Sequence, residues 1–210
     1  MGEIMFQVLK SGGLLMIPIA MCAIGATFII FERIFYFRGI KKREKGFLVE
    51  INRMISGRHF EEAIILCDKV NTPVSKVVKK ALECRTLHEN HIKEAVSSSV
   101  ELLIPELEHF LTPLGTISNI STLLGLLGTV TGNIQAFGVL GATASMGNPA
   151  LLAGAIAEAL VTTASGLVVS IPAVIFHNYF VSRVNRYIAE MEGAATSVIL
   201  QICSRPIMGV

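Results

Sequence analysis

The feature that most constrains this chain is a stretch of seventy-three residues, from Phe110 to Ser182, that carries one formal charge, the carboxylate of Glu158. A charged side chain at bilayer depth costs roughly 2.5–3.5 kcal/mol on insertion scales, so such residues usually face a bundle interior or a water-filled cavity. The whole chain has a mean hydropathy of +0.62, which is too apolar for an ordinary soluble domain of 210 residues. We therefore expect an integral membrane protein with Glu158 as its functional centre.

A first apolar run, Leu14 to Phe31, contains eighteen uncharged residues, enough for a helix to span a bilayer with little tilt. A cleaved signal peptide is the competing interpretation, but little positive charge precedes the run and no A-x-A-like site follows it. The predicted fold is all-α, with three transmembrane helices and long helices extending into a cytoplasmic helical domain. The predicted segments are a short periplasmic head at 1–13, transmembrane helices at 14–37, 110–140 and 151–182, the cytoplasmic domain at 38–109, a periplasmic loop at 141–150 and a cytoplasmic tail at 183–210.

The basic residues are unevenly distributed, with thirteen of the eighteen Lys and Arg lying between Arg38 and Lys93. Positive charge collects on the cytoplasmic side of membrane proteins, so this distribution predicts an N-terminus outside the cytoplasm and a cytoplasmic C-terminus. No aromatic-interleaved basic motif favours nucleic acid as a partner. The cysteines lack CxxC spacing and the histidines lack tight ligand spacing, so we expect neither a metal site nor a cofactor. Without a nucleophile triad or phosphate loop, an enzyme is not expected and no catalytic residue is proposed.

The third span places its polar and small residues on one side of a helix. At about 100° per residue, this face falls within an arc of roughly 140°. Its members are Glu158, Thr162, Thr163, Gly166, Ser170, Ala173 and His177. The face predicts a polar interior around Glu158. The alternative for each hydroxyl is that it only joins neighbouring helices, as small polar residues often do in membranes.

The second span carries its own stripe of small and hydroxyl residues at intervals of three and four: Gly115, Ser118, Thr122, Gly125, Thr129 and Gly132. Such a face permits close helix approach, and Gly128 with Gly132 forms a small-xxx-small element. We expect Gly115, Gly125, Gly128, Gly132 and Gly166 to pack helices. Thr122 and Thr129 could equally line a wet path together with Glu158, Thr162 and Thr163.

The polar middle of the chain is helical in pattern. Thr72 is expected to cap a helix that begins at Pro73. A later helix, beginning near Glu89, is expected to run unbroken into the membrane with bends at Pro105 and Pro113. Glu32 and Arg33, at the end of the first span, could pair across a helix contact, and the favoured interpretation is that both are solvated.

Two runs in the apolar stretch resemble one family. The run from Thr122 to Phe137, which contains Gly-Leu-Leu-Gly-Thr-Val-Thr-Gly, closely resembles the second membrane helix of the ExbB/TolQ/MotA proton-channel family. The run from Ala155 to Ala173 is similar to that family's third helix, and Glu32-Arg33 after the first span is also family-like. Three spans without a large extra cytoplasmic insertion favour the ExbB/TolQ branch over MotA.

The resemblance implies a homo-oligomer, a pentamer, that surrounds the membrane helices of an ExbD- or TolR-type single-span partner. It implies a motor in the bacterial inner membrane that uses the proton gradient to drive a TonB- or TolA-type protein. Glu158 matches the family's helix-three glutamate, and Thr129 and Thr163 match threonines that line its pore. Thr162 and His177 have no such match, so their roles rest on the helical face alone.

Two alternatives stay open at this point. The short head leaves a TolQ-like subunit of a Tol-Pal envelope motor beside the ExbB-like one, and the choice between proton and sodium is also open. The alternative of another class is a non-conducting membrane scaffold, in which Glu158 only anchors helix contacts.

Overall fold

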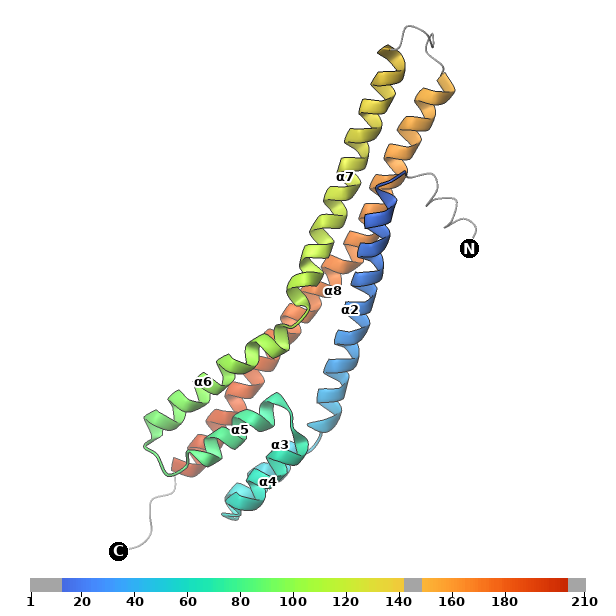
Figure 1. Cartoon of the computed structure of the whole chain (residues 1–210). Helices are drawn as coiled ribbons and strands as arrows, with labels where there is room; N and C mark the ends of the chain where they lie inside the picture. The colour runs from blue at the N-terminus through green and yellow to red at the C-terminus, as the bar shows by residue number, and fades with distance from the viewer. Residues whose placement is uncertain (1–12, 142–148, 204–210) are drawn as a thin grey trace, which may run out of the picture. The chain divides into compact units, whose positions relative to one another are not determined.

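The computed structural model of the protein describes residues 13–141 and 149–203, and every regular element in these two ranges is an α-helix (Figure 1). The all-α prediction is confirmed. The helices are α2 (Met16–Arg43), α3 (Phe47–Ser56), α4 (Phe60–Val70), α5 (Pro73–Glu83), α6 (Glu89–Glu108), α7 (Leu111–Gly141) and α8 (Pro149–Cys203).

Three helical segments are long and apolar enough to cross a membrane: Met16–Ser56, Glu89–Gly138 and Pro149–Cys203. Their large apolar side chains are widely exposed, including Ile24 at 72%, Leu123 at 62% and Val168 at 71%. Apolar surface on this scale marks a membrane or a protein interface. The class predicted from the sequence, a membrane protein with three long apolar helices, is therefore confirmed. The exact borders of the spans stay a prediction.

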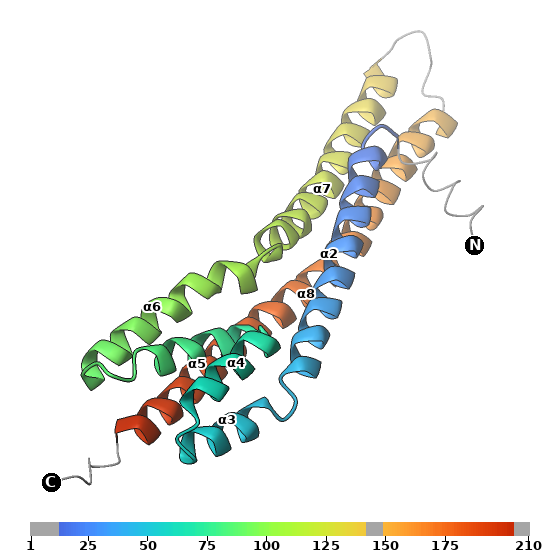
Figure 2. The same cartoon turned by 60° about the horizontal axis from the view of Figure 1, so that its bottom comes forward.

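The chain divides into two compact units, and the first comprises Met1–Glu32 with Phe110–Tyr179. In this unit α7 and α8 lie side by side, as Figures 1 and 2 both show. The two helices approach closely because glycines face each other: a Cβ at Gly166 would lie 2.5 Å from the Ser121 carbonyl oxygen. Thr163 donates a hydrogen bond across the pair to the Gly125 carbonyl at 2.7 Å. Small residues and hydroxyls thus join the two helices.

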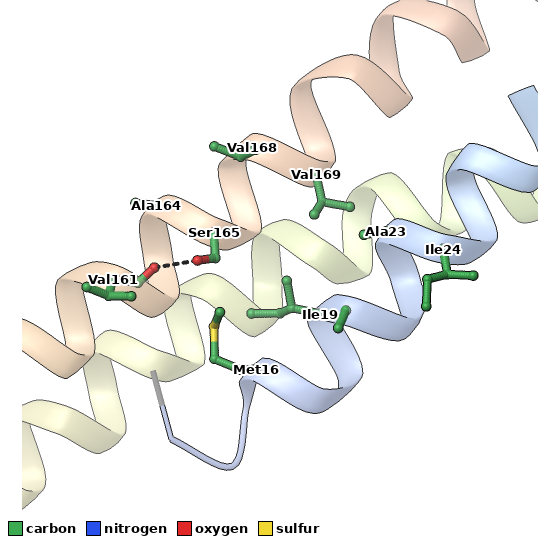
Figure 3. A pocket seen from close by; sticks show the side chains of 10 residues that line it. Met16, Ile19, Ala23, Ile24, Val161, Ala164, Ser165, Val168 and Val169 are labelled. Atoms are coloured by element: carbon green, nitrogen blue, oxygen red, sulfur yellow. Dashed lines mark hydrogen bonds between the residues drawn. The ribbon is translucent and has the colours of Figure 1, made fainter. Parts of the chain in front are cut away.

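An apolar cavity of about 620 Å³ lies between α2 and α8 in the same unit (Figure 3). Met16 and Ile19 line it from α2, and Val161 and Val169 line it from α8. Ser165 carries the one hydroxyl among its lining residues, and that hydroxyl donates to the Val161 carbonyl of its own helix at 2.8 Å.

The second unit comprises Arg33–His109 with Phe180–Val210. Its core is formed by fully buried side chains from α3, α5, α6 and the later part of α8, among them Ile51, Leu82, Ile92 and Met191. Burial of these side chains in this polar part of the chain is what packs these helices into one unit.

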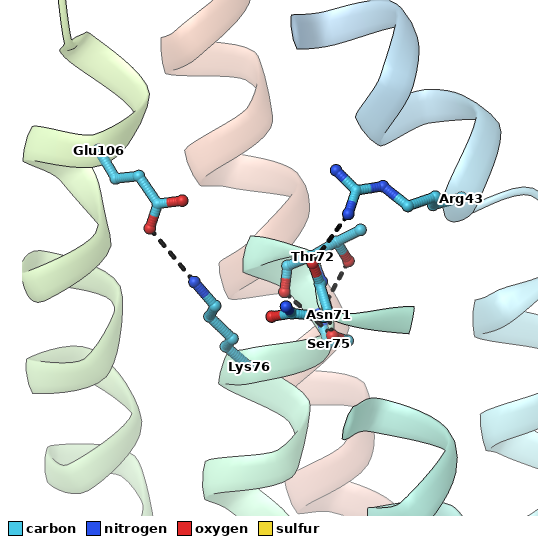
Figure 4. A network of polar contacts seen from close by, with 6 residues as sticks. All are labelled: Arg43, Asn71, Thr72, Ser75, Lys76 and Glu106. Atoms are coloured by element: carbon cyan, nitrogen blue, oxygen red, sulfur yellow. Dashed lines mark hydrogen bonds and ion pairs between the residues drawn. The ribbon is translucent and has the colours of Figure 1, made fainter. Parts of the chain in front are cut away.

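The start of α5 follows the sequence prediction. Thr72 is the N-cap, its Oγ1 accepts from the Ser75 backbone N–H, and Pro73 occupies the first helical position. Ser75 Oγ accepts in return from the Thr72 backbone N–H at 2.9 Å, which completes a capping box (Figure 4). The cap predicted from Thr72 and Pro73 is confirmed.

The expected unbroken helix from Glu89 into the membrane is wrong. The helix α6 ends at Glu108, and α7 begins at Leu111 after Phe110, whose φ is 65°. Pro113 lies in the first turn of α7, where its missing N–H costs nothing. In a continuous helix its ring would clash with the carbonyl of His109, four residues earlier. Pro105, by contrast, is accommodated inside α6.

The interpretation of Arg33 as a solvated residue is also wrong. Its side chain is 2% exposed, and Nη1 donates to the Leu107 carbonyl at 3.2 Å, inside the second unit. Leu107 belongs to the last turn of α6, where carbonyls lack helical partners and the helix dipole favours a cation. The guanidinium also lies 4.9 Å from the centre of the Tyr36 ring. Arg33 therefore caps the end of α6.

Candidate functional site

Glu158, the one charge of the long apolar stretch, lies on α8 with its side chain half-buried in the first unit. It lines a cavity of about 250 Å³ that is bounded by α7, by α8 and by the chain entering α2. The residues that share this cavity with it are Leu14, Leu15, Gly128, Thr131, Gly132, Gln135 and Thr162. A titratable side chain thus meets three polar side chains in an otherwise apolar unit.

Gly13 covers one side of the glutamate. Its φ is 64°, and a Cβ added there would collide with the Glu158 carboxylate. Only glycine combines this left-handed backbone with such a close approach. The backbone before α2 therefore lies directly against the Glu158 carboxylate.

Thr162 lies one helical turn after Glu158 and is 1% exposed. Its hydroxyl donates to the Glu158 backbone carbonyl at 2.8 Å, and its methyl group packs toward Gly128, where a Cβ would lie 2.5 Å from Thr162 Cγ2. Of the threonines singled out in the sequence, this is the one that the structure places in the cavity of Glu158.

Thr129 and Thr163 lie elsewhere on α7 and α8 and do not line that cavity. The Thr163 hydroxyl donates across to the Gly125 carbonyl, and Thr129 donates within its own helix to the Leu126 carbonyl at 2.7 Å. In both residues the hydroxyl proton is used by a backbone carbonyl, while the oxygen keeps lone pairs that can accept.

A cluster of hydroxyl groups joins α7 to α8 at positions that precede Gly125 in α7. Thr122 donates to Ser170 Oγ at 2.7 Å, and the hydroxyl of Ser118 lies 3.4 Å from the same oxygen.

His177 fills the space next to Gly115, where a Cβ would lie 2.9 Å from its Nε2. A Cβ at Gly132 would likewise meet the side chain of Ala159. These contacts all lie between helices of one chain.

The sequence reasoning missed Thr131 and Gln135. Together with Gly128 and Gly132 they occupy positions i, i+3, i+4 and i+7 of α7, which is one face of a helix. The stripe recognised in the sequence began at Gly115 and included Thr129; it shares Gly132 with the cavity face but otherwise follows a neighbouring one. An i, i+4 pair of polar residues, Thr131 and Gln135, was the available signal. In the described ranges 13–141 and 149–203, no group of three or more His, Cys, Asp or Glu could hold a metal ion.

Comparison with known proteins decides the family. The sequence profile described as the MotA/TolQ/ExbB proton channel family matches residues 69–193, more than half of the chain and including both long membrane motifs. The chain belongs to the MotA/TolQ/ExbB family. This is a family of proton channels rather than of enzymes.

Relatives within the MotA/TolQ/ExbB family carry ExbB names. The ExbB-like 3 protein of Synechocystis sp. is 29% identical over 172 residues, which cover 81% of each chain. The biopolymer transport protein ExbB of Pseudomonas putida is 31% identical over 198 residues, 90% of this chain and 59% of that protein. The ExbB homolog of Methanothermobacter thermautotrophicus is 28% identical over 187 residues, 89% of this chain and 66% of that protein. The chain is an ExbB-like member of its family.

Proposed function

We propose that the chain is a proton-conducting subunit in which Glu158 takes up and releases the transported proton. The observation that carries this proposal is the position of Glu158, the one formal charge between Phe110 and Ser182, on a cavity with Thr131, Gln135 and Thr162. Retaining a charge at membrane depth is costly, and hydroxyls could join helices at lower cost. Membership of a proton-channel family supports the same role.

The finer proposal is a motor of the ExbB type. One membrane carboxylate is a poor complete proton wire, because a proton must be passed to a second titratable group. We propose that an ExbD- or TolR-type single-span partner supplies that group from inside a homo-oligomer, a pentamer, of this chain. The assembly lies in the inner membrane with its N-terminus periplasmic, and drives a TonB-type protein for outer-membrane transport. The names of relatives, biopolymer transport protein ExbB, favour this branch over a TolQ-like one that drives a TolA-type protein.

The test of the proton role is replacement of Glu158. Glu158→Ala should abolish proton uptake into inverted membrane vesicles that contain the full chain and its native partners, because no other carboxylate occupies the apolar stretch. Native mass spectrometry of the same variant should give the wild-type oligomer. Undiminished proton uptake with an intact oligomer would instead favour the scaffold, in which Glu158 only anchors helices.

Thr129 and Thr163 are tested by removing one oxygen each. A lost interhelical hydrogen bond in a membrane protein costs on average only about 0.6 kcal/mol, so Thr163→Val should still assemble although its bond to Gly125 disappears. If the hydroxyls accept from a moving carboxyl group or water, both valine variants lose most proton-driven work while Thr→Ser variants keep much of it. Full activity in both valine variants would remove these threonines from the proton path and leave Glu158 in place.

A further inference from the structure

We propose that Glu158 exchanges its proton through a hydrated pocket inside a single chain, lined by Thr131 and Gln135 of α7 and opening toward the ends of α7 and α8 that the 142–148 segment joins. This inference rests on the proposed proton role of Glu158 and adds the route by which the proton reaches it. In each exchange a hydronium ion in the pocket gives a proton to the carboxylate and leaves as water, and the reverse step releases the proton.

The pocket is large enough and polar enough to hold water. Its volume is about 250 Å³, and each water occupies about 30 Å³ in the liquid, so several waters fit. A buried water needs two to four polar partners. The Gln135 amide offers two donors and an acceptor. The Thr131 hydroxyl donates to the Leu127 carbonyl at 3.0 Å and keeps lone pairs toward water.

The direction of the pocket follows from helix geometry. Gly128, Thr131, Gly132 and Gln135 form one face of α7 that extends for about 10 Å along the axis, at 1.5 Å per residue. Gln135 stands six residues, or about 9 Å, before the end of α7 at Gly141. Gln135 is exposed whereas Thr162, beside Glu158, is buried. The polar face therefore leads from Glu158 toward that end of the helices.

The apolar cavity between α2 and α8 in the same unit offers a comparison, because its lining provides few polar partners for water. It is larger, at about 620 Å³, but its lining is apolar and its one hydroxyl, on Ser165, is already bonded to Val161 (Figure 3). No lining residue of that cavity titrates. Polar partners for water are concentrated in the pocket with Glu158. The polarity of the lining, rather than the volume, therefore decides which of the two cavities holds water.

The pocket is tested by replacing its polar lining with apolar groups of similar size. Gln135→Leu and Thr131→Val each remove one polar partner for water from the pocket, and we expect proton uptake into vesicles to fall by about tenfold for Gln135→Leu. Matched controls lie on the same helix outside the pocket: Asn133→Leu and Thr116→Val. Thr116, like Thr131, donates to the carbonyl four residues earlier, at 2.9 Å. Both controls should keep uptake within about twofold of wild type, since neither residue lines the pocket.

A chemical measurement keeps the inference testable if an apolar variant assembles poorly. In a chain whose native cysteines are replaced, Gln135→Cys should react with a small cationic methanethiosulfonate in membranes, and the reaction should block proton uptake. Asn133→Cys should keep its uptake after the same treatment. Wild-type uptake in Gln135→Leu, or a Gln135→Cys variant that conducts but does not react, would overturn the pocket route. Loss of uptake in Glu158→Ala in those same vesicles would show that the proton role itself survives, whereas retained uptake there would refute both.

Discussion

The close backbone approach of α7 and α8 at Gly166 makes Gly166→Ala an informative stability test. A Cβ at Gly166 would lie 2.5 Å from the Ser121 carbonyl oxygen and 3.0 Å from Gly125 Cα, both of them backbone atoms. Ordinary contact begins at 3.4 Å, so the helices would have to separate by about 0.9 Å. That separation would also stretch the bond from Thr163 to the Gly125 carbonyl, now 2.7 Å.

The expected cost combines these effects. Overpacking of this kind costs about 1–3 kcal/mol, and a stretched interhelical hydrogen bond adds on average about 0.6 kcal/mol. Replacing glycine by alanine inside a helix gains about 0.5–1 kcal/mol, which offsets part of the cost. The net destabilisation is about 1–3 kcal/mol. For a chain of this length that lowers the thermal midpoint by about 3–10 °C.

The matched control is Gly154→Ala in the same helix, where a Cβ would meet nothing within 4 Å. It should gain the helix propensity alone and melt at or slightly above wild type. Thermal midpoints are measured by far-ultraviolet circular dichroism in detergent for both variants. A Gly166→Ala protein that melts as high as Gly154→Ala would refute the close approach of the two helices at this position.

Three further predictions follow from the second unit and from the orientation. Tyr187 donates a hydrogen bond to the Glu44 carboxylate, and burial raises the pKa of Glu44 although that bond lowers it in part. A raised carboxyl pKa means that stability falls as pH rises through it, and Tyr187→Phe raises the pKa of Glu44 further. Tyr187→Phe should therefore destabilise the protein by about 1 kcal/mol at pH 8 and by less at pH 5, measured in a pH series of melts. Burial raises the pKa of the Cys67 thiol to about 12, whereas Cys203 is exposed, so maleimide mass spectrometry at pH 7.5 should find Cys203 modified and Cys67 unmodified until the protein unfolds. A cysteine at Gly141 should react with an impermeant reagent added outside intact cells, and labelling from the cytoplasmic side alone would reverse the proposed orientation.

The sequence determined the class of the protein because the signals for it are local. Uncharged runs such as Leu14–Phe31 need no distant partner to indicate a membrane helix, since their length alone matches a bilayer. The cap at Thr72 and Pro73 depends on adjacent residues and was equally predictable. Glu158 stood out because a single charge in seventy-three residues is costly wherever the helices lie.

The tertiary structure decided which side chains meet. Arg33 is buried because it reaches the Leu107 carbonyl, 74 residues later, and nothing near Arg33 in the sequence indicates that contact. Thr131 and Gln135 share a cavity with Glu158 because that face of α7 is turned toward it, while Thr129, two residues from Thr131, does not line the cavity. Helical periodicity tells which residues share a face, but the rotation of that face toward a neighbour depends on the packing of distant glycines such as Gly125 and Gly166. The choice of Glu158 as the candidate carboxylate therefore followed from local chemistry, and its surroundings from the way two helices fit together.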